Sequence, residues 1–203
     1  NGNVLGLLVE EARVNLFPNS EAIDVTLNSQ QQVSVSDVSI TEGVYQGTWR
    51  NITEDTSTNQ HRLVSGGSIN ITPNVSYTFS ALVKRTSGLR DVQFTLFNSG
   101  DSVVGNFSLS NETATTESTG SATAQSADIE NLGNGVYLVS VTGIVSTTAT
   151  SCFELVRLTD DGTETYTGDG TSSVAITAMQ LEQGSFKTSY IPTSGSTATR
   201  AAD

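Results

Sequence analysis

The sequence predicts an all-β protein, a two-sheet antiparallel β-sandwich with jelly-roll topology. Two observations lead to this fold class. Short runs of alternating apolar and polar residues recur at intervals of roughly 8–15 residues along the 203-residue chain, separated by Gly, Asn and Asp. The chain also contains 27 Ser and 29 Thr, whereas only 15% of its residues are charged. Strand surfaces favour Thr, whereas helix surfaces favour Glu, Lys and Arg, so this composition favours sheet over helix.

The first elements are an opening strand and an irregular one. A mixed apolar run over 5–16, followed by turn residues in FPNSEA, indicates a strand and then a loop. In VSVSDVSI (33–40), the first two valines share one phase, whereas Val38 and Ile40 share the other. A strand there needs a bulge near Asp37 to keep both pairs inward.

Two strand pairs follow. YTFSALV (77–83) and DVQFTLF (91–97) alternate cleanly on either side of the basic turn KRTSGLR, which predicts a hairpin. VYLVSVTGIV (136–145) and SCFELVRL (151–158) flank the turn STTAT and predict a further pair. The hydroxyl-rich segment 111–126, which lies between the first pair and the second, is either a flexible loop or a polar strand.

The last strands come from VAITAMQLE, whose apolar phase slips before Met179, and from SYIPT, which Pro192 confines to a sheet edge or a strand end. Residues 193–203, TSGSTATRAAD, contain no apolar anchor. We therefore expect one sandwich domain over 1–192 and a connector to a further domain over 193–203.

Charge and single residues exclude several classes of protein. A net charge of -12 and a pI near 4.3 argue against nucleic-acid binding. No run of 18 apolar residues occurs and the N-terminus lacks a signal-peptide pattern, so we expect neither membrane insertion nor a secretion signal. One cysteine, Cys152, and one histidine, His61, exclude zinc clusters and multi-histidine sites. Cys152 is expected to be a small buried hydrophobe and His61 a structural residue.

Catalysis is not expected. The sequence has no nucleophile elbow, no Gly-rich phosphate loop and no metal-binding histidine pair. A pair of carboxylates suited to glycoside hydrolysis is compatible with 21 acidic residues, but these are spread over turns and strand surfaces, where solvated charge is the usual explanation. We predict a non-catalytic protein.

Aromatic residues are the candidate ligand-binding residues. In VYQGTWRN, Tyr45 and Trp49 lie four residues apart, so on a strand both rings project from one face, with Arg50 beside them. Such rings stack against the apolar face of a sugar. Tyr166, in TETYTGDGT, is the second candidate. The alternatives are that Trp49 packs in the core and that Tyr166 packs within its loop.

Several segments carry a family resemblance. GLLVEEARVNLFPNSE and AMQLEQGSFKTSYIPTSGSTATRAAD resemble the paired borders of a domain of bacteriophage tail and other virion proteins, and EDTSTNQHRL, YTFSALVK, LGNGVYLVSV and YTGDGTSSVAI resemble the same domain in the same order. This domain is similar to jelly-roll carbohydrate-binding modules. The segment NLFPNSEAID resembles the opening of such modules, and MQLE resembles their closing strand. The resemblance implies a sandwich fold and a virion setting.

Calcium is the cofactor that best suits such a sandwich, because the chain is rich in carboxylates and poor in nitrogen and sulfur ligands. The alternative is that these are turn carboxylates that hold no ion. The resemblance implies that Glu21, Asp24 and Glu182 are the calcium ligands. An alternative is the acidic run DDGTETYTGDG, with carboxylates at positions 160, 161 and 169.

These observations favour a non-catalytic virion module, in a tail fibre or a decoration protein, that binds host-surface glycans. Because the chain is strongly acidic, we expect neutral glycans or protein partners. The virion surface is the expected location, after folding without disulfides in the host cytoplasm. Two alternatives remain: a structural connector that trimerises and contacts other virion proteins, and an accessory carbohydrate-binding module of a secreted polysaccharide-degrading enzyme.

Overall fold

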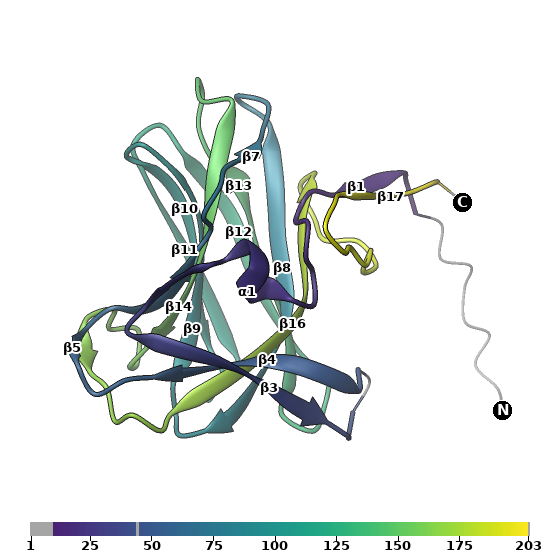
Figure 1. Ribbon diagram of the computed structural model, residues 1–203. Helices are drawn as coiled ribbons and strands as arrows, with labels where there is room; N and C mark the ends of the chain where they lie inside the picture. Colours follow the sequence, from purple (N-terminus) through teal and green to yellow (C-terminus); the bar gives the residue numbers. More distant parts are fainter. Residues whose placement is uncertain (1–9, 44, 203) are drawn as a thin grey trace, which may run out of the picture.

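The computed structural model describes residues 10–43 and 45–202, and it shows two antiparallel sheets packed face to face (Figure 1). The first sheet contains β2 (Ser29–Gln31), β6 (His61–Val64), β7 (Ile69–Asn70), β9 (Asp91–Asn98), β10 (Asp101–Ser108), β11 (Thr113–Thr119) and β14 (Ser151–Thr159). The second contains β3 (Val33–Ile40), β4 (Gly47–Glu54), β8 (Ser76–Ser87), β12 (Thr123–Asn131), β13 (Val136–Ile144) and β16 (Ser173–Gln183). The predicted all-β sandwich is confirmed.

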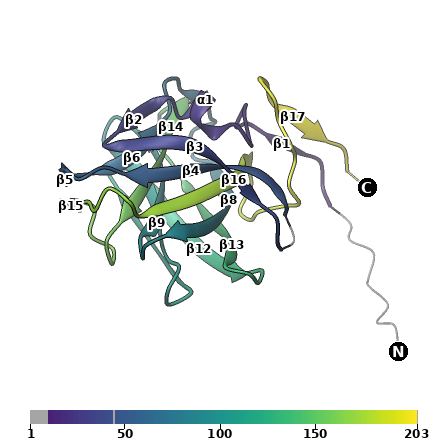
Figure 2. The same cartoon turned by 60° about the horizontal axis from the view of Figure 1, so that its bottom comes forward.

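The seven-stranded sheet has the order β11-β10-β9-β14-β6-β2, with β7 also paired to β14, and the six-stranded sheet has the order β12-β13-β8-β16-β4-β3. Two short ribbons complete the strands: β1 (Arg13–Asn15) pairs with β17 (Ala198–Arg200), and β5 (Thr58–Asn59) pairs with β15 (Tyr166–Thr167). One short helix, α1 (Ile23–Thr26), lies in the segment between β1 and β2 (Figures 1 and 2). None of the helices in the described part of the chain is long and apolar enough to cross a membrane.

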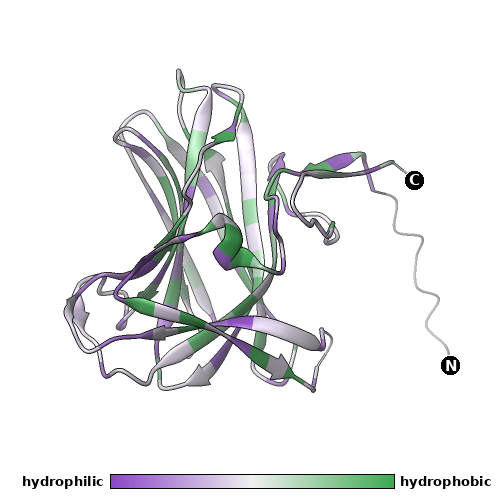
Figure 3. Cartoon of the chain, in the orientation of Figure 1, coloured by the Kyte–Doolittle hydropathy of each residue, from purple (hydrophilic) through white to green (hydrophobic). Residues whose placement is uncertain are grey.

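Apolar side chains from both sheets fill the space between them. Phe79 from the six-stranded sheet lies 5.2 Å from Phe94 of the seven-stranded sheet, and Phe94 lies 5.7 Å from Phe107, measured between ring centroids. Phe17 and Ile23, from the segment that includes α1, close the core at its open side, where Figure 3 shows the helix mainly in the hydrophobic colour. Burial of these side chains is the main stabilising contribution to the fold.

The predicted hairpin over 77–97 is wrong, because β8 belongs to the six-stranded sheet and β9 to the seven-stranded sheet. The later pair, β13 and β14, is divided in the same way. In each case both runs are apolar on the face that lines the core between the two sheets. Alternation shows which face of a strand is buried, but it contains no information about the hydrogen-bonded partner.

The bulge predicted near Asp37 is absent, because β3 pairs with β4 in unbroken register from Val33 to Ile40. Val33 and Val35 pack against the core between the sheets, whereas the second apolar pair of β3 packs against a separate cluster on the other face. The phase slip predicted before Met179 is a real bulge in β16, between Thr177 and Gln180. The segment 111–126, for which a loop and a polar strand were both considered, contains strand residues of β11 and β12.

The boundary predicted at residue 192 falls inside the domain. Thr193 is buried, its backbone N–H donates to Ser20 Oγ at 2.8 Å, and its hydroxyl donates to the Phe17 carbonyl at 2.6 Å. Farther along, β17 pairs with β1 in a ribbon that stands off one side of the sandwich (Figure 1). A segment without apolar anchors is here held by hydrogen bonds instead.

Candidate ligand-binding site

Trp49 is buried, with 1% of its surface exposed, so the prediction that it forms an exposed stacking platform is wrong. It lies on the outer face of the six-stranded sheet, opposite in direction to the core residue Ile52 of the same strand. There it packs in an apolar cluster with Leu82 and Val136. Trp49 therefore packs beneath this surface, and residues of the cluster shield its ring from solvent.

Tyr45 and Tyr190 are the partly buried rings that pack against this cluster. Their centroids are 5.7 Å apart and their planes meet at 78°, which is an edge-to-face pair. The Tyr45 hydroxyl donates to Glu21 Oε1 at 3.2 Å, and the Tyr190 hydroxyl lies 2.5 Å from Ser20 Oγ. Burial raises the pKa of both tyrosines, so their hydroxyls stay protonated. Each tyrosine is thus held by its contact with the other ring and by its hydroxyl group before any ligand binds.

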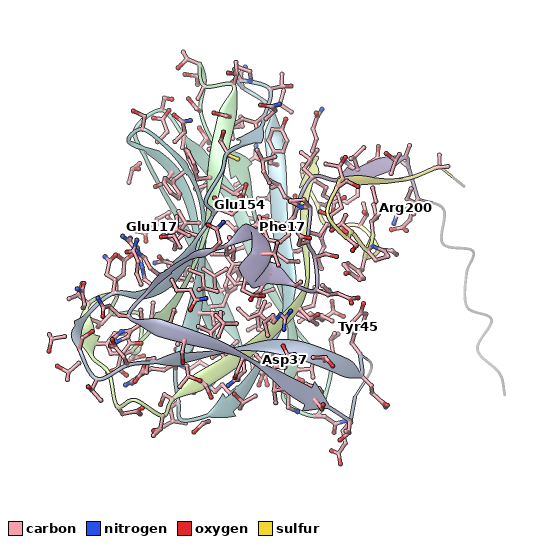
Figure 4. All side chains as sticks on the ribbon, in the orientation of Figure 1. Phe17, Asp37, Tyr45, Glu117, Glu154 and Arg200 are labelled. Carbon is pink, nitrogen blue, oxygen red and sulfur yellow. The ribbon has the colours of Figure 1, made fainter. Side chains whose placement is uncertain are left out.

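Beside the two rings lies a hollow of about 140 Å³. Its floor is the outer face of the sheet, mainly Leu82, Leu138 and Ala178, and its walls come from Ser80, Gln180 and the segment 188–190. We call this site the tyrosine hollow. Figure 4 shows Tyr45 on the side of the sandwich that faces the C-terminal segment. An apolar floor, two aromatic rings and hydroxyl groups at the edge suit a ring-shaped ligand with one apolar face.

Polar residues of β16 hold the segment that carries Tyr190. The buried Glu182 carboxylate accepts hydrogen bonds from the Thr188 N–H and the Thr188 hydroxyl, both at 2.8 Å. Gln180 Oε1 accepts from the Ile191 N–H at 2.8 Å, and Gln180 Nε2 donates to Glu182 Oε1 at 2.8 Å. The sequence prediction missed Tyr190, because no sequence pattern shows the side-chain hydrogen bonds that hold SYIPT beside Tyr45.

The three carboxylates predicted to hold calcium do not form a joint site. Glu21 accepts from Tyr45, Asp24 forms an ion pair with Arg50 at 2.8 Å, and Glu182 anchors Thr188. Among residues 10–43 and 45–202, no group of three or more His, Cys, Asp or Glu side chains is arranged to hold a metal ion. These donors do not fit a calcium ion, and calcium binding elsewhere stays a prediction.

The alternative acidic run is also engaged within the protein. Asp160 forms an ion pair with Arg90 at 2.6 Å. Asp169 accepts from the Ser172 hydroxyl at 2.6 Å and from the Thr171 N–H at 2.7 Å, and these hydrogen bonds hold its pKa well below the ordinary range. Asp161 lines a different hollow. Asp160 and Asp169 are therefore engaged in contacts within the protein.

Arg50 and Tyr166, the other predicted ligand-binding residues, are occupied by contacts within the protein. The Arg50 guanidinium pairs with both Asp24 and Asp37. Tyr166 is 7% exposed, so its prediction as an accessible platform is wrong. Its hydroxyl donates to Glu54 Oε2 at 2.7 Å, and its ring lies 4.6 Å from the buried His61 ring. Of the four predicted residues, the structure leaves Tyr45 in a position to contact a ligand.

Comparisons with known proteins do not show a family for this chain. No protein-family model matches the sequence, and the comparison with curated proteins gave no match. Nine chains of known structure match, among them the CBM22-1 xylan-binding domain of Xyn10C from Paenibacillus barcinonensis. That domain is 13% identical, with a TM-score of 0.39, and the match covers 86% of this chain and 94% of that domain.

Proposed function

We propose that this protein is a non-catalytic glycan-binding module whose tyrosine hollow takes one pyranose ring of a neutral glycan. The observation that carries the proposal is the pair of tyrosine rings held edge to face beside an apolar floor. The apolar face of a pyranose packs on such a surface, while the hydroxyls at its edge bind polar groups. Ser80, Thr188 and Ser189 supply those groups at the edge of the hollow.

Preorganisation favours binding at this site. The Tyr45 and Tyr190 hydroxyls already have partners in Ser20 and Glu21, so a ligand loses little free energy to ordering these side chains. The volume of about 140 Å³ limits the contact to roughly one ring. We expect weak binding of single sugars and tighter binding of glycans presented in several copies.

The test is a glycan array followed by calorimetric titration of the neutral glycans that bind. Tyr45→Ala and Tyr190→Ala should each weaken binding by about tenfold, the loss expected when one stacked ring is removed. Phe186→Ala is the matched control, since Phe186 is an exposed aromatic of the same segment that lies outside the hollow. Binding that survives both tyrosine substitutions, or no binding of any neutral glycan, would contradict the proposal.

The virion setting belongs to this proposal and rests on the sequence resemblance of the two border segments. In that setting the module would attach a particle to host-surface glycans. A cell-binding assay with the purified protein and its Tyr45→Ala variant tests this part separately. The connector and accessory-module alternatives stay predictions.

A further inference from the structure

We infer a second binding site, on the outer face of the seven-stranded sheet, for a saccharide that carries a carboxylate, with Arg62 as the residue that binds the carboxylate. This site goes beyond the proposed function, because it lies on the other sheet and shares no residue with the tyrosine hollow. Figure 4 shows Glu117, from an edge strand of this sheet, on the opposite side of the molecule from Tyr45.

The strand register builds this surface from three rows that run across the sheet. Residues directly opposite each other in paired strands project to the same face. The first row is polar and crosses five strands, β2, β6, β14, β9 and β10, through Gln31, Arg62, Arg157, Gln93 and Asn106. The second is mostly apolar, with Val64, Leu155, Thr95 and Val104. The third contains Phe153 and Phe97, whose rings stack with centroids 5.5 Å apart.

A hollow of about 300 Å³ spans these rows, from Arg62 in the first row over Leu155 in the second to Phe97 in the third. Its size lies at the lower end of the range of small-molecule sites. A ligand in it meets a guanidinium on one side and a flat apolar surface on the other. This surface suits a sugar ring whose edge carries an anionic group.

Arg62 differs from the other arginines in its charge environment. Within the described ranges 10–43 and 45–202, the other six arginines each have a carboxylate within 4.0 Å, whereas Arg62 has none. Its Nε donates to Gln31 Oε1 at 2.7 Å, which orients the guanidinium without neutralising it. In a chain with a net charge of -12, one unneutralised cation in a hollow is a specific anion-binding group.

The neighbouring Arg157 strengthens this inference. It lies directly opposite Arg62 in the β14–β6 pair, and its charge is balanced by Glu164 at 2.5 Å. Its side chain is 8% exposed, and its Nε has no hydrogen-bond partner among the described residues. A carboxylate bound to Arg62 would therefore lie beside a second guanidinium group, which also attracts it.

The charge of the whole molecule selects the kind of acidic ligand. A densely charged polyanion is repelled by a protein of net charge -12. A single uronate residue within an otherwise neutral glycan presents one carboxylate to Arg62 and one ring face to Leu155 and Phe97. The Gln31 amide and the Thr95 hydroxyl line the same hollow and can bind its hydroxyl groups.

The test is to titrate the protein with three probes and to monitor binding by NMR. The probes are a methyl uronide, its neutral uronamide and the corresponding methyl glycoside. We expect the uronide to bind about tenfold more tightly than the uronamide, and its affinity to fall as salt is added. Arg62→Gln should reduce uronide affinity to that of the uronamide. This variant removes a cation without leaving a carboxylate unpaired, so the fold should persist, which circular dichroism checks. Lys187→Gln, which removes a cation from the segment beside the tyrosine hollow, should leave uronide binding unchanged.

Equal binding of uronide and uronamide would overturn the inference, and so would uronide binding that survives Arg62→Gln. A short peptide with one glutamate serves as the competing probe, and peptide binding as tight as uronide binding would overturn the assignment to a saccharide. Tyr45→Ala should not affect uronide affinity, and Arg62→Gln should not affect neutral glycans. Failure at one site is thereby distinguished from failure at the other.

Discussion

Glu154, labelled in Figure 4, is an acidic residue on the inward face of β14, between the two sheets. Its side chain is fully buried, one carboxyl oxygen lies 3.9 Å from Cys152 Sγ, and the other has no hydrogen-bond partner among the described residues. Burial raises the pKa of Glu154 from its ordinary value of 4.5 to about 8. The core therefore contains a carboxyl group that is neutral at pH 7.

This pKa shift predicts a pH-dependent effect of Glu154→Gln. Between pH 4.5 and pH 8 the unfolded chain loses a proton that the folded chain keeps, so this group lowers the free energy of unfolding as the pH rises through that range. Glutamine stays neutral at every pH. Relative to the natural chain, the variant should gain on the order of a few kcal/mol from pH 5 to pH 8. Urea unfolding at both pH values measures the gain, and a constant difference would refute the shift.

At the scale of elements, the connection from β8 to β9 decides how the sheets are joined. The chain leaves the six-stranded sheet after Ser87 and enters the seven-stranded sheet at Asp91, with Gly88 between them at φ +68°. A Cβ added to Gly88 would lie 1.8 Å from Ser172 Oγ. Glycine is required there for two independent reasons, the left-handed backbone and the close contact.

We expect Gly88→Ala to lower the free energy of unfolding by about 1–3 kcal/mol, because it adds backbone strain and a steric clash. Gly67→Ala is the control, since Gly67 lies in open space with an ordinary backbone conformation. Chemical denaturation of both variants gives the comparison. Equal stability of the two variants would show that this crossing tolerates a side chain.

At the scale of the whole molecule, a buried ionic network links the two sheets at one end of the sandwich. Glu54 on β4 accepts from Arg90 Nε at 2.8 Å and from Arg90 Nη2 at 2.9 Å, and it also accepts from the Tyr166 hydroxyl. The Arg90 guanidinium lies 4.5 Å from the centroid of the Tyr166 ring. These contacts join both sheets and the β15 loop at one end of the sandwich.

Arg90→Met should destabilise the fold by about 3–5 kcal/mol, because it leaves the buried Glu54 carboxylate without its cation. Arg200→Met breaks the ion pair with Glu10 in the more exposed terminal segments, at 2.7 Å, and should cost less than about 1 kcal/mol. Thermal unfolding of the two variants separates these cases. Similar losses would show that the network is not the main link at this end.

Parts of the candidate site could be predicted from the sequence. Tyr45 lies in an aromatic pattern that is visible in the chain, and it lines the tyrosine hollow. Tyr190 and Arg62 could not be found in this way. Tyr190 reaches the hollow through hydrogen bonds between residues that the alternation does not relate. Arg62 becomes notable when the ion pairs of the other six arginines are known, and no pattern in the sequence identifies those pairs.

The alternation of side chains by itself determined that this protein is a sandwich of short strands, since one face of each strand must leave water. It also determined where β16 slips in phase. Tertiary structure decided which strands pair, which apolar cluster buries Trp49 and which charges are neutralised. The physical reason is that strand pairing and ion pairing depend on which segments meet in space, whereas a sequence pattern reports the local division between water and core.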